Sequence, residues 1–222
     1  MALVIRNENV LFDDWRHSRS FQFGSHNIQI EQNWDGLGVA GVVWEAALSL
    51  SIFLWSHPEI VKNKQVLELG AGMGLCSIVI SLLGSSIVST DKADVLPLLR
   101  TNIFNNIPKF NESGFYNANA KCPSVFVEEF DWFNPPKPLT DKPYDIIIGA
   151  DLVYDVNLFP VLAGIFRQLI NQNNFILLST RIRYNKDEDF IKSLEHKYGF
   201  VVETLYRCQQ YNVIISKIYN SN

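Results

Sequence analysis

The sequence predicts an α/β protein built on a mostly parallel, doubly wound sheet. The apolar run 66–69 is followed by glycine at every second position of 70–74, and a later apolar run ends in Asp91. Doubly wound sheets use this order of strand, glycine turn, helix, strand and carboxylate to hold a nucleoside. The apolar run 146–148 is continuous rather than alternating, as expected of a strand buried on both faces.

The first 41 residues are expected to form a polar N-terminal arm, ahead of a single domain over residues 42–222. Two short strands are predicted near Phe21–Phe23 and Ile28–Gln32. The second alternates apolar and polar residues, as a half-exposed strand does. Three glycines shortly before residue 42 predict a flexible approach to a helix over roughly 43–56.

From residue 65 onward, apolar runs of strand length alternate with longer runs of helix length. The expected strands are Val66–Leu69, Ile87–Thr90, Ser124–Phe130, Tyr144–Ala150, Phe175–Thr180, Val201–Tyr206 and Tyr211–Ile218. The expected helices lie near Leu75–Leu83, Val95–Asn105, Asn157–Ile170 and Lys186–Tyr198. The last two strands are close enough to pair as an antiparallel hairpin. The result is a seven-stranded sheet with helices on both faces.

Two segments interrupt this alternation. Residues 106–123 contain Asn, Gly and Pro and are expected to form a surface excursion. Residues 133–143 hold four prolines, which are expected to replace the helix that would otherwise follow the third strand of the sheet.

The composition fits one soluble, intracellular domain. A chain of 222 residues can bury about 70–75% of its unfolded surface, so it needs no disulfides. The net charge of −4 argues against nucleic-acid binding. Three scattered cysteines without a C-x-x-C pair are expected to be reduced thiols, and neither a signal peptide nor a membrane span is predicted. We therefore expect a cytoplasmic protein, with the nucleus as a second location.

The spacing of the glycines distinguishes between nucleoside ligands. Dinucleotide-binding folds favour a third glycine three residues after the second, and that position is Leu75 in this chain. The form Glu-x-Gly-x-Gly-x-Gly over 68–74 is more usual for S-adenosylmethionine, whose adenosine carries no phosphates. The sequence therefore predicts S-adenosylmethionine as the cofactor, and an NAD-dependent enzyme is the weaker interpretation.

The candidate site residues follow the strands, because ligands of an open parallel sheet bind beyond the carboxyl ends of its strands. They are Gly70-Ala71-Gly72, Asp91, Asp131-Trp132, the run from Gly149 to Tyr154, and the run from Arg181 to Tyr184. His17, His26, His57 and His196 show no ligand spacing, so no metal site is expected.

Several candidates also have plainer interpretations. Asp91 suits two ribose hydroxyls, because its two oxygens both accept hydrogen bonds, but it could instead cap the helix near Val95. Trp132 could stack on adenine or simply pack in the core. Trp44 follows an apolar pair at the start of a predicted helix, and physical reasoning alone favours a packing role for it.

Asp151 and Tyr154 are the candidates for reaction chemistry. They lie three residues apart in a segment that leaves the sheet, so a turn would bring both side chains to the rim. A lysine ε-amine has a pKa of about 10.4 and must lose its proton before it can accept a methyl group. A carboxylate can orient this amine while an aromatic wall excludes water. The alternative for Asp151 is a residue that stabilises a turn.

Three segments of the chain resemble the seven-β-strand, class I protein-lysine methyltransferases of the methyltransferase-like family. They are Val-Val-Trp-Glu-Ala-Ala at 42–47, Glu-Leu-Gly-Ala-Gly-Met-Gly-Leu at 68–75 and Gly-Ala-Asp-Leu-Val-Tyr at 149–154. The resemblance is to the subgroup that acts on Hsp70-type chaperones, AAA ATPases and translation elongation factors. The segment Arg-Ile-Arg-Tyr-Asn-Lys-Asp at 181–187 is similar to the Hsp70-directed branch. The chain departs from the family at Glu45, where Asp is more usual, and in the segment 106–123, which is longer than expected.

The resemblance implies a Rossmann-like class I methyltransferase sheet, preceded by a short β arm. It implies contacts with S-adenosylmethionine from Trp44, Gly70, Ala71, Gly72, Asp91, Trp132 and Ala150. It further implies that Asp151 and Tyr154 lie beside the acceptor lysine. Arg181 and Arg183 either contact an acidic substrate surface or are simply solvated.

The expected function is therefore S-adenosylmethionine-dependent methylation of a lysine ε-amine on a cytosolic protein, by a monomeric enzyme. The expected partner is a chaperone, an AAA ATPase or an elongation factor, with neither nucleic acid nor membrane involved. One alternative is a small-molecule N-methyltransferase on the same fold, although the short N-terminal arm is a poor lid for a small substrate. A second is a non-catalytic binding module that keeps the fold alone.

Overall fold

Seven strands form one mixed sheet in the computed structural model, which describes residues 17–107 and 124–220. In sheet order they are β5 (Val125–Glu129), β4 (Ser86–Asp91), β3 (Gln65–Leu69), β6 (Ile146–Ala150), β7 (Phe175–Arg181), β9 (Val213–Asn220) and β8 (Phe200–Cys208). The first five are parallel, and β9 runs antiparallel to both β7 and β8. The predicted seven-stranded sheet with a C-terminal hairpin is confirmed.

The order of the strands reverses at the centre of the sheet. The chain runs outward from β3 to β4 and β5, then returns to place β6 on the other side of β3. In such sheets a crevice opens at the carboxyl ends of the two strands that flank the reversal. The loops after β3 and β6 therefore border the expected ligand site.

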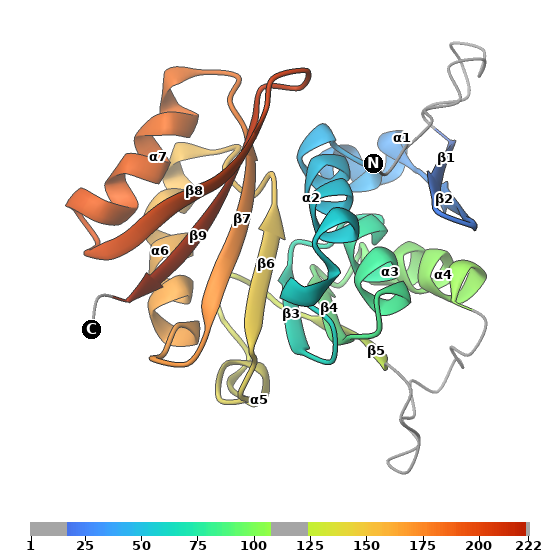
Figure 1. Ribbon diagram of the computed structural model, residues 1–222, viewed down its shortest axis with the longest axis horizontal. Coiled ribbons are helices and arrows are strands. Elements are labelled where there is room, and N and C mark those ends of the chain that lie inside the picture. Colours follow the sequence, from blue (N-terminus) through green and yellow to red (C-terminus); the bar gives the residue numbers. More distant parts are fainter. Residues whose placement is uncertain (1–16, 108–123, 221–222) are drawn as a thin grey trace.

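Helices cover both faces of this sheet, as Figure 1 shows. In chain order they are α1 (Trp34–Leu37), α2 (Glu45–Ser56), α3 (Leu75–Leu82), α4 (Leu96–Asn106), α5 (Lys137–Thr140), α6 (Phe159–Leu169) and α7 (Asn185–His196). One core cluster joins α2, α3 and α4 to the sheet, and a second joins α6 and α7 to the opposite face. The sequence of α6 shows which side of this helix packs on the sheet, because its apolar residues form one stripe. The buried residues of this stripe are Leu162, Ala163, Ile165, Phe166 and Leu169.

The two N-terminal strands, β1 (Ser18–Phe23) and β2 (His26–Glu31), form a separate antiparallel hairpin. As its alternation predicts, β2 buries Ile28 and Ile30 and exposes Gln29 between them. Two asparagines of α4 pair with its backbone: Asn102 Oδ1 accepts from the Glu31 amide at 2.8 Å, and Asn106 Oδ1 accepts from the Gln29 amide at 2.9 Å. These bonds satisfy a strand edge that would otherwise be open.

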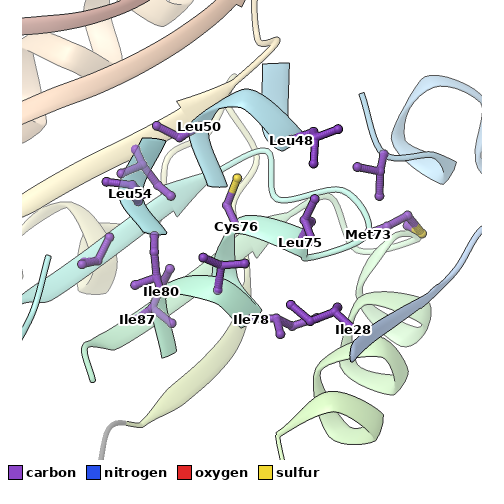
Figure 2. Close-up of a cluster of buried hydrophobic side chains, with 14 of the residues drawn as sticks. Ile28, Leu48, Leu50, Leu54, Met73, Leu75, Cys76, Ile78, Ile80 and Ile87 are labelled. Atoms are coloured by element: carbon purple, nitrogen blue, oxygen red, sulfur yellow. The ribbon is translucent and has the colours of Figure 1, made fainter. Parts of the chain in front are cut away.

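The hairpin, α2 and α3 meet in the first core cluster. Figure 2 shows the labelled side chains of this cluster: Ile28, Leu48, Leu50, Leu54, Met73, Leu75, Cys76, Ile78, Ile80 and Ile87. The packing fixes the start of α3, and with it the glycine loop. Residues of the hairpin thus share a core with the sheet, and a domain boundary at residue 41 remains a prediction.

The structure corrects two local expectations. The glycines before residue 42 do not form a flexible approach: α1 and a 3-10 turn, η1 (Gly38–Gly41), occupy this stretch. Asn33 stabilises it, since its side chain accepts from the Gly36 amide at 2.9 Å and its own amide donates to the Gly41 carbonyl at 2.8 Å. Within 133–143 the prolines leave one helical turn, α5, instead of none.

Other expectations concern bounds, thiols and membranes. Strand β8 is longer than the predicted Val201–Tyr206, because its ladder with β9 continues past a bulge at Thr204/Tyr206. Strand β9 has the predicted length but starts and ends two residues later than Tyr211–Ile218. Cys76 and Cys208 are free thiols, whereas Cys122 and most of the 106–123 segment lie outside the described residues. No single described helix is long and apolar enough to cross a membrane. One bent pair of helical segments has the length and the apolar composition of a membrane span: Trp34–Gly41 and Glu45–Ser56, with a bend of 53° between them. Most of Glu45–Ser56 is buried in the core, as in a core helix of a globular protein.

Candidate active site

A cavity of about 330 Å³ opens at the carboxyl ends of β3, β4, β5 and β6. This is within the size range of small-ligand sites. Each residue to which the sequence analysis gave a cofactor or catalytic role lines it: Trp44, Gly70, Ala71, Gly72, Asp91, Trp132, Ala150, Asp151 and Tyr154. Of the other candidates that follow the strands, Gly149, Arg181 and Ile182 do not line it. The structure thus brings residues from five separate segments into one place.

The glycine loop forms the floor of the cavity beside β3. Gly70, Gly72 and Gly74 have φ values of 63°, 53° and 88°, a left-handed backbone that other residues adopt only with strain. A Cβ on Gly70 would lie 2.8 Å from a Leu152 methyl group, and one on Gly74 would lie 2.7 Å from Leu99. The loop therefore needs glycine for its backbone conformation and for close packing.

Asp91 ends β4 and fastens the glycine loop. Its Oδ2 accepts a hydrogen bond from the Gly72 amide at 2.7 Å, and its Oδ1 accepts from the Lys92 amide at 2.8 Å. The capping alternative is wrong, because α4 begins after Val95 without a side-chain cap. Burial raises the pKa of Asp91 above its usual value, and the two amide hydrogen bonds oppose this effect. Each oxygen keeps a further lone pair, so the carboxylate can accept two more hydroxyl groups.

Glu68 is a lining residue that the sequence interpretation did not single out. Its carboxyl group is fully buried and pairs with the Ser77 hydroxyl of α3, which lies 2.7 Å from the Ser89 hydroxyl of β4. Burial raises the pKa of Glu68 to about 8, so the group is mostly protonated at neutral pH. It links β3, α3 and β4 beneath the loop. Its position as the first residue of the Glu-x-Gly-x-Gly motif is the sequence feature that could have identified it as a site residue.

Two tryptophans border the cavity. Trp44 precedes α2, is half-buried, and donates from Nε1 to the Val39 carbonyl at 2.7 Å. Trp132 follows β5 and packs against the second core cluster, so its core interpretation is partly right. It also faces the cavity, since its ring lies 6.5 Å from that of Tyr154 and would be 3.4 Å from a Cβ on Gly70. Both rings present apolar surface to a ligand.

Asp151 follows β6 with its backbone in the left-handed region at a φ of 58°. Its carboxylate accepts two hydrogen bonds from Arg183, at 2.9 Å to Oδ1 and 2.5 Å to Oδ2. This ion pair, rather than a local turn, occupies the side chain. The guanidinium also lies over the ring of Trp44, 5.2 Å from its centroid.

Neither arginine is simply solvated. Arg183 binds Asp151, and Arg181 forms an ion pair with Glu45 at 2.7 Å. In the described structure both guanidinium groups are therefore engaged within the chain. The position of Arg183 just past β7, on the same rim as Asp151, was the sequence signal for this contact.

Tyr154 stands at the mouth of the cavity with 45% of its surface exposed. Partial burial raises its pKa, and the negative charges of Asp91 and Asp155 add to the effect. Its phenol therefore stays neutral at physiological pH. Lys186 donates to the Tyr154 carbonyl at 2.8 Å and holds this segment near the start of α7. The ring is thus a neutral wall beside the carboxylate.

Comparison with known proteins assigns this arrangement to a family. A family model described as lysine methyltransferase matches residues 22–197. The chain belongs to the lysine methyltransferase family. Protein N-lysine methyltransferase METTL21A of Xenopus tropicalis is 40% identical over 189 residues, which are 85% of this chain and 81% of that protein. EEF1A lysine methyltransferase 3 of Mus musculus is 31% identical, over 95% of this chain and 85% of that protein.

The fold of this lysine methyltransferase recurs in a solved structure. It superposes on the Thermus thermophilus 16S rRNA N2 G1207 methyltransferase, determined with AdoMet and guanosine, at a TM-score of 0.66 and 18% identity. The match covers 100% of this chain and 58% of the other. The chain is an S-adenosylmethionine-dependent protein-lysine N-methyltransferase with a Rossmann-like class I fold.

The residues in the cavity fit the family's cofactor, S-adenosylmethionine. The glycines place no side chain on the floor of the cavity, and buried Asp91 offers carboxylate acceptors of the kind that a ribose diol needs. The tryptophans add apolar walls. When bound, this cofactor supplies a methyl group on a positively charged sulfur.

Proposed function

We propose that this lysine methyltransferase acts in the cytosol as a monomer and that its substrate is an Hsp70-type chaperone. Translation elongation factors and AAA ATPases are the next candidates. EEF1A lysine methyltransferase 3 is named for an elongation factor, and at 31% identity it is less similar to this chain than METTL21A at 40%, which ranks an elongation factor lower as the substrate. The resemblance of residues 181–187 to the Hsp70-directed branch supports the same order.

We propose that one part of the cavity binds the nucleoside of the cofactor and that another part receives the acceptor amine. Asp91 accepts the ribose hydroxyls, and the backbone of Gly70, Ala71, Gly72 and Ala150 cradles the rest of the cofactor. Trp132 stacks on the base, and Trp44 closes the opposite wall. Each assignment rests on the residue lining the same cavity.

We propose that Asp151 and Tyr154 receive the acceptor lysine. A free ammonium group has a pKa of about 10.4, so it must lose its proton on entering the site. The carboxylate of Asp151 is only 7% exposed and fixed at both oxygens, which suits it to orient the amine. The neutral ring of Tyr154, next to Trp132, excludes water from the amine. The observation that carries this proposal is the fixed, buried carboxylate at the end of β6.

Radiolabelled S-adenosylmethionine tests the substrate. The pure enzyme is incubated separately with a purified Hsp70-type chaperone, elongation factor 1A, an AAA ATPase and a set of small amines, and labelled lysines are mapped by mass spectrometry. Calorimetry with S-adenosylhomocysteine measures cofactor binding in parallel. We expect label on the chaperone. Label only on small amines would favour the small-molecule alternative. Binding of S-adenosylhomocysteine without any transfer would favour a non-catalytic module.

A further inference from the structure

Exposed hydrophobic side chains gather around the mouth of the cavity. Among the described residues, seven large hydrophobic side chains are exposed, and four of them line the cavity: Val39, Phe133, Tyr154 and Tyr184. We call these four the mouth patch. Phe133 and Tyr184 are 74% and 66% exposed, so they extend outward beyond the reach of a molecule held inside. Concentrated exposed apolar surface marks an interaction site more often than scattered single residues do.

The mouth patch is assembled from four different segments. Val39 lies in η1, Phe133 follows β5, Tyr154 follows β6, and Tyr184 immediately precedes α7. Local hydrogen bonds fix the backbone of two of them: the Phe133 amide donates to Asp131 at 3.0 Å, and the Tyr184 amide donates to Asp187 at 2.9 Å. A preorganised aromatic surface binds a partner at low entropic cost.

Charged side chains of both signs line the mouth. Exposed Asp94 and Asp131 lie at the same opening as Phe133, together with exposed Lys92. Carboxylates beside aromatic rings suit a cationic side chain flanked by apolar ones. Aromatic residues are enriched in protein interfaces and contribute much of their binding energy.

We infer that the mouth patch docks the substrate protein by binding apolar side chains that flank the acceptor lysine. This inference rests on the proposed function, since it assigns the protein contact of the same site. The patch supplies affinity for the protein, whereas the cavity beneath it supplies the chemistry. A free lysine or a small amine lacks the flanking surface and gains nothing from the patch.

Steady-state kinetics test this division. Phe133→Ser and Tyr184→Ser are compared with Phe104→Ser, which changes an equally apolar, 47% exposed residue of α4 that does not line the cavity. With the purified Hsp70-type chaperone as substrate, each mouth variant should raise KM about tenfold or more, the effect of losing a residue that contributes strongly to an interface. The kcat should change less than about twofold. Affinity for S-adenosylhomocysteine should equal that of the wild type in all three, which also shows that each variant is folded.

Two failures are distinguishable. If the wild type labels the chaperone but the mouth variants keep the KM of Phe104→Ser, the docking inference is wrong and the proposed function stands. If the wild type labels no protein under any condition, the proposed function fails and the docking inference fails with it.

Discussion

The Arg183 guanidinium holds both carboxylate oxygens of Asp151, with its Nη1 2.9 Å from Oδ1 and its Nη2 2.5 Å from Oδ2. The same guanidinium lies over the ring of Trp44. A side chain from the end of β7 therefore links the carboxylate at the end of β6 to a wall of the cofactor cavity. Two parallel bonds fix the plane of the carboxylate as well as its position.

Removing this guanidinium should change the pH dependence of catalysis. A nearby cation favours the neutral form of an amine, whereas an unpaired carboxylate favours its ammonium form. We therefore expect Arg183→Gln to lower kcat at pH 7 about tenfold and to move the rise of kcat to higher pH, since the pH dependence of kcat reports groups in the enzyme–substrate complex and about 1.4 kcal/mol corresponds to one pKa unit. Arg181→Gln, which breaks the ion pair with Glu45 instead, is the matched control. Equal pH profiles for the two variants would rule out this role for Arg183.

Asp91 should determine cofactor affinity. Asp91→Ala removes both acceptors offered to a ribose, at a cost of roughly 2–4 kcal/mol if the bonds are buried and charge-assisted. It also leaves the Gly72 and Lys92 amides without their acceptor, so a modest fall in Tm should accompany the loss. Calorimetry with S-adenosylhomocysteine measures the affinity. Binding as tight as that of the wild type would remove Asp91 from the cofactor site.

Glu68 should make stability depend on pH. Its pKa is about 8 in the folded protein and near 4.5 when unfolded, so the folded state binds the extra proton between these values. The wild type should therefore lose stability as pH rises from about 4.5 to about 8, by a few kcal/mol at most. Glu68→Gln keeps a neutral group and should not show this loss.

Urea unfolding at pH 5 and pH 8.5 measures the difference between wild type and Glu68→Gln at each pH. The difference should shift in favour of the variant at the higher pH. Glu59→Gln, at an exposed position, controls for the loss of a carboxylate. A constant difference for Glu68→Gln would mean that Glu68 is ionised in the folded protein.

Much of the sheet and the membership of the cavity could be predicted from the sequence. Continuous apolar runs define parallel strands, and the residue types that follow them then share one edge. That reasoning brought Gly70, Asp91 and Asp151 together, and the structure places all three at the same cavity. The roles assigned to these residues remain predictions.

The rest depended on packing that a linear pattern does not encode. The pairing of Asp151 with Arg183 joins residues 32 positions apart and depends on side-chain conformation. The protonation of Glu68 follows from its burial under α3. The order in α1 and η1 comes from hydrogen bonds that Asn33 makes with Gly36 and Gly41, which override the usual freedom of glycine.

The most direct test concerns Asp151. Its left-handed backbone makes Asn the cleanest substitution, because Asn tolerates this conformation better than Ala does. Asp151→Asn should lower single-turnover methyl transfer to the substrate lysine about 10²-fold or more, equivalent to about 2.7 kcal/mol of transition-state positioning. Its affinity for S-adenosylhomocysteine should stay close to that of the wild type. Methyl transfer at the wild-type rate would contradict the assignment of Asp151 as the residue that orients the acceptor amine.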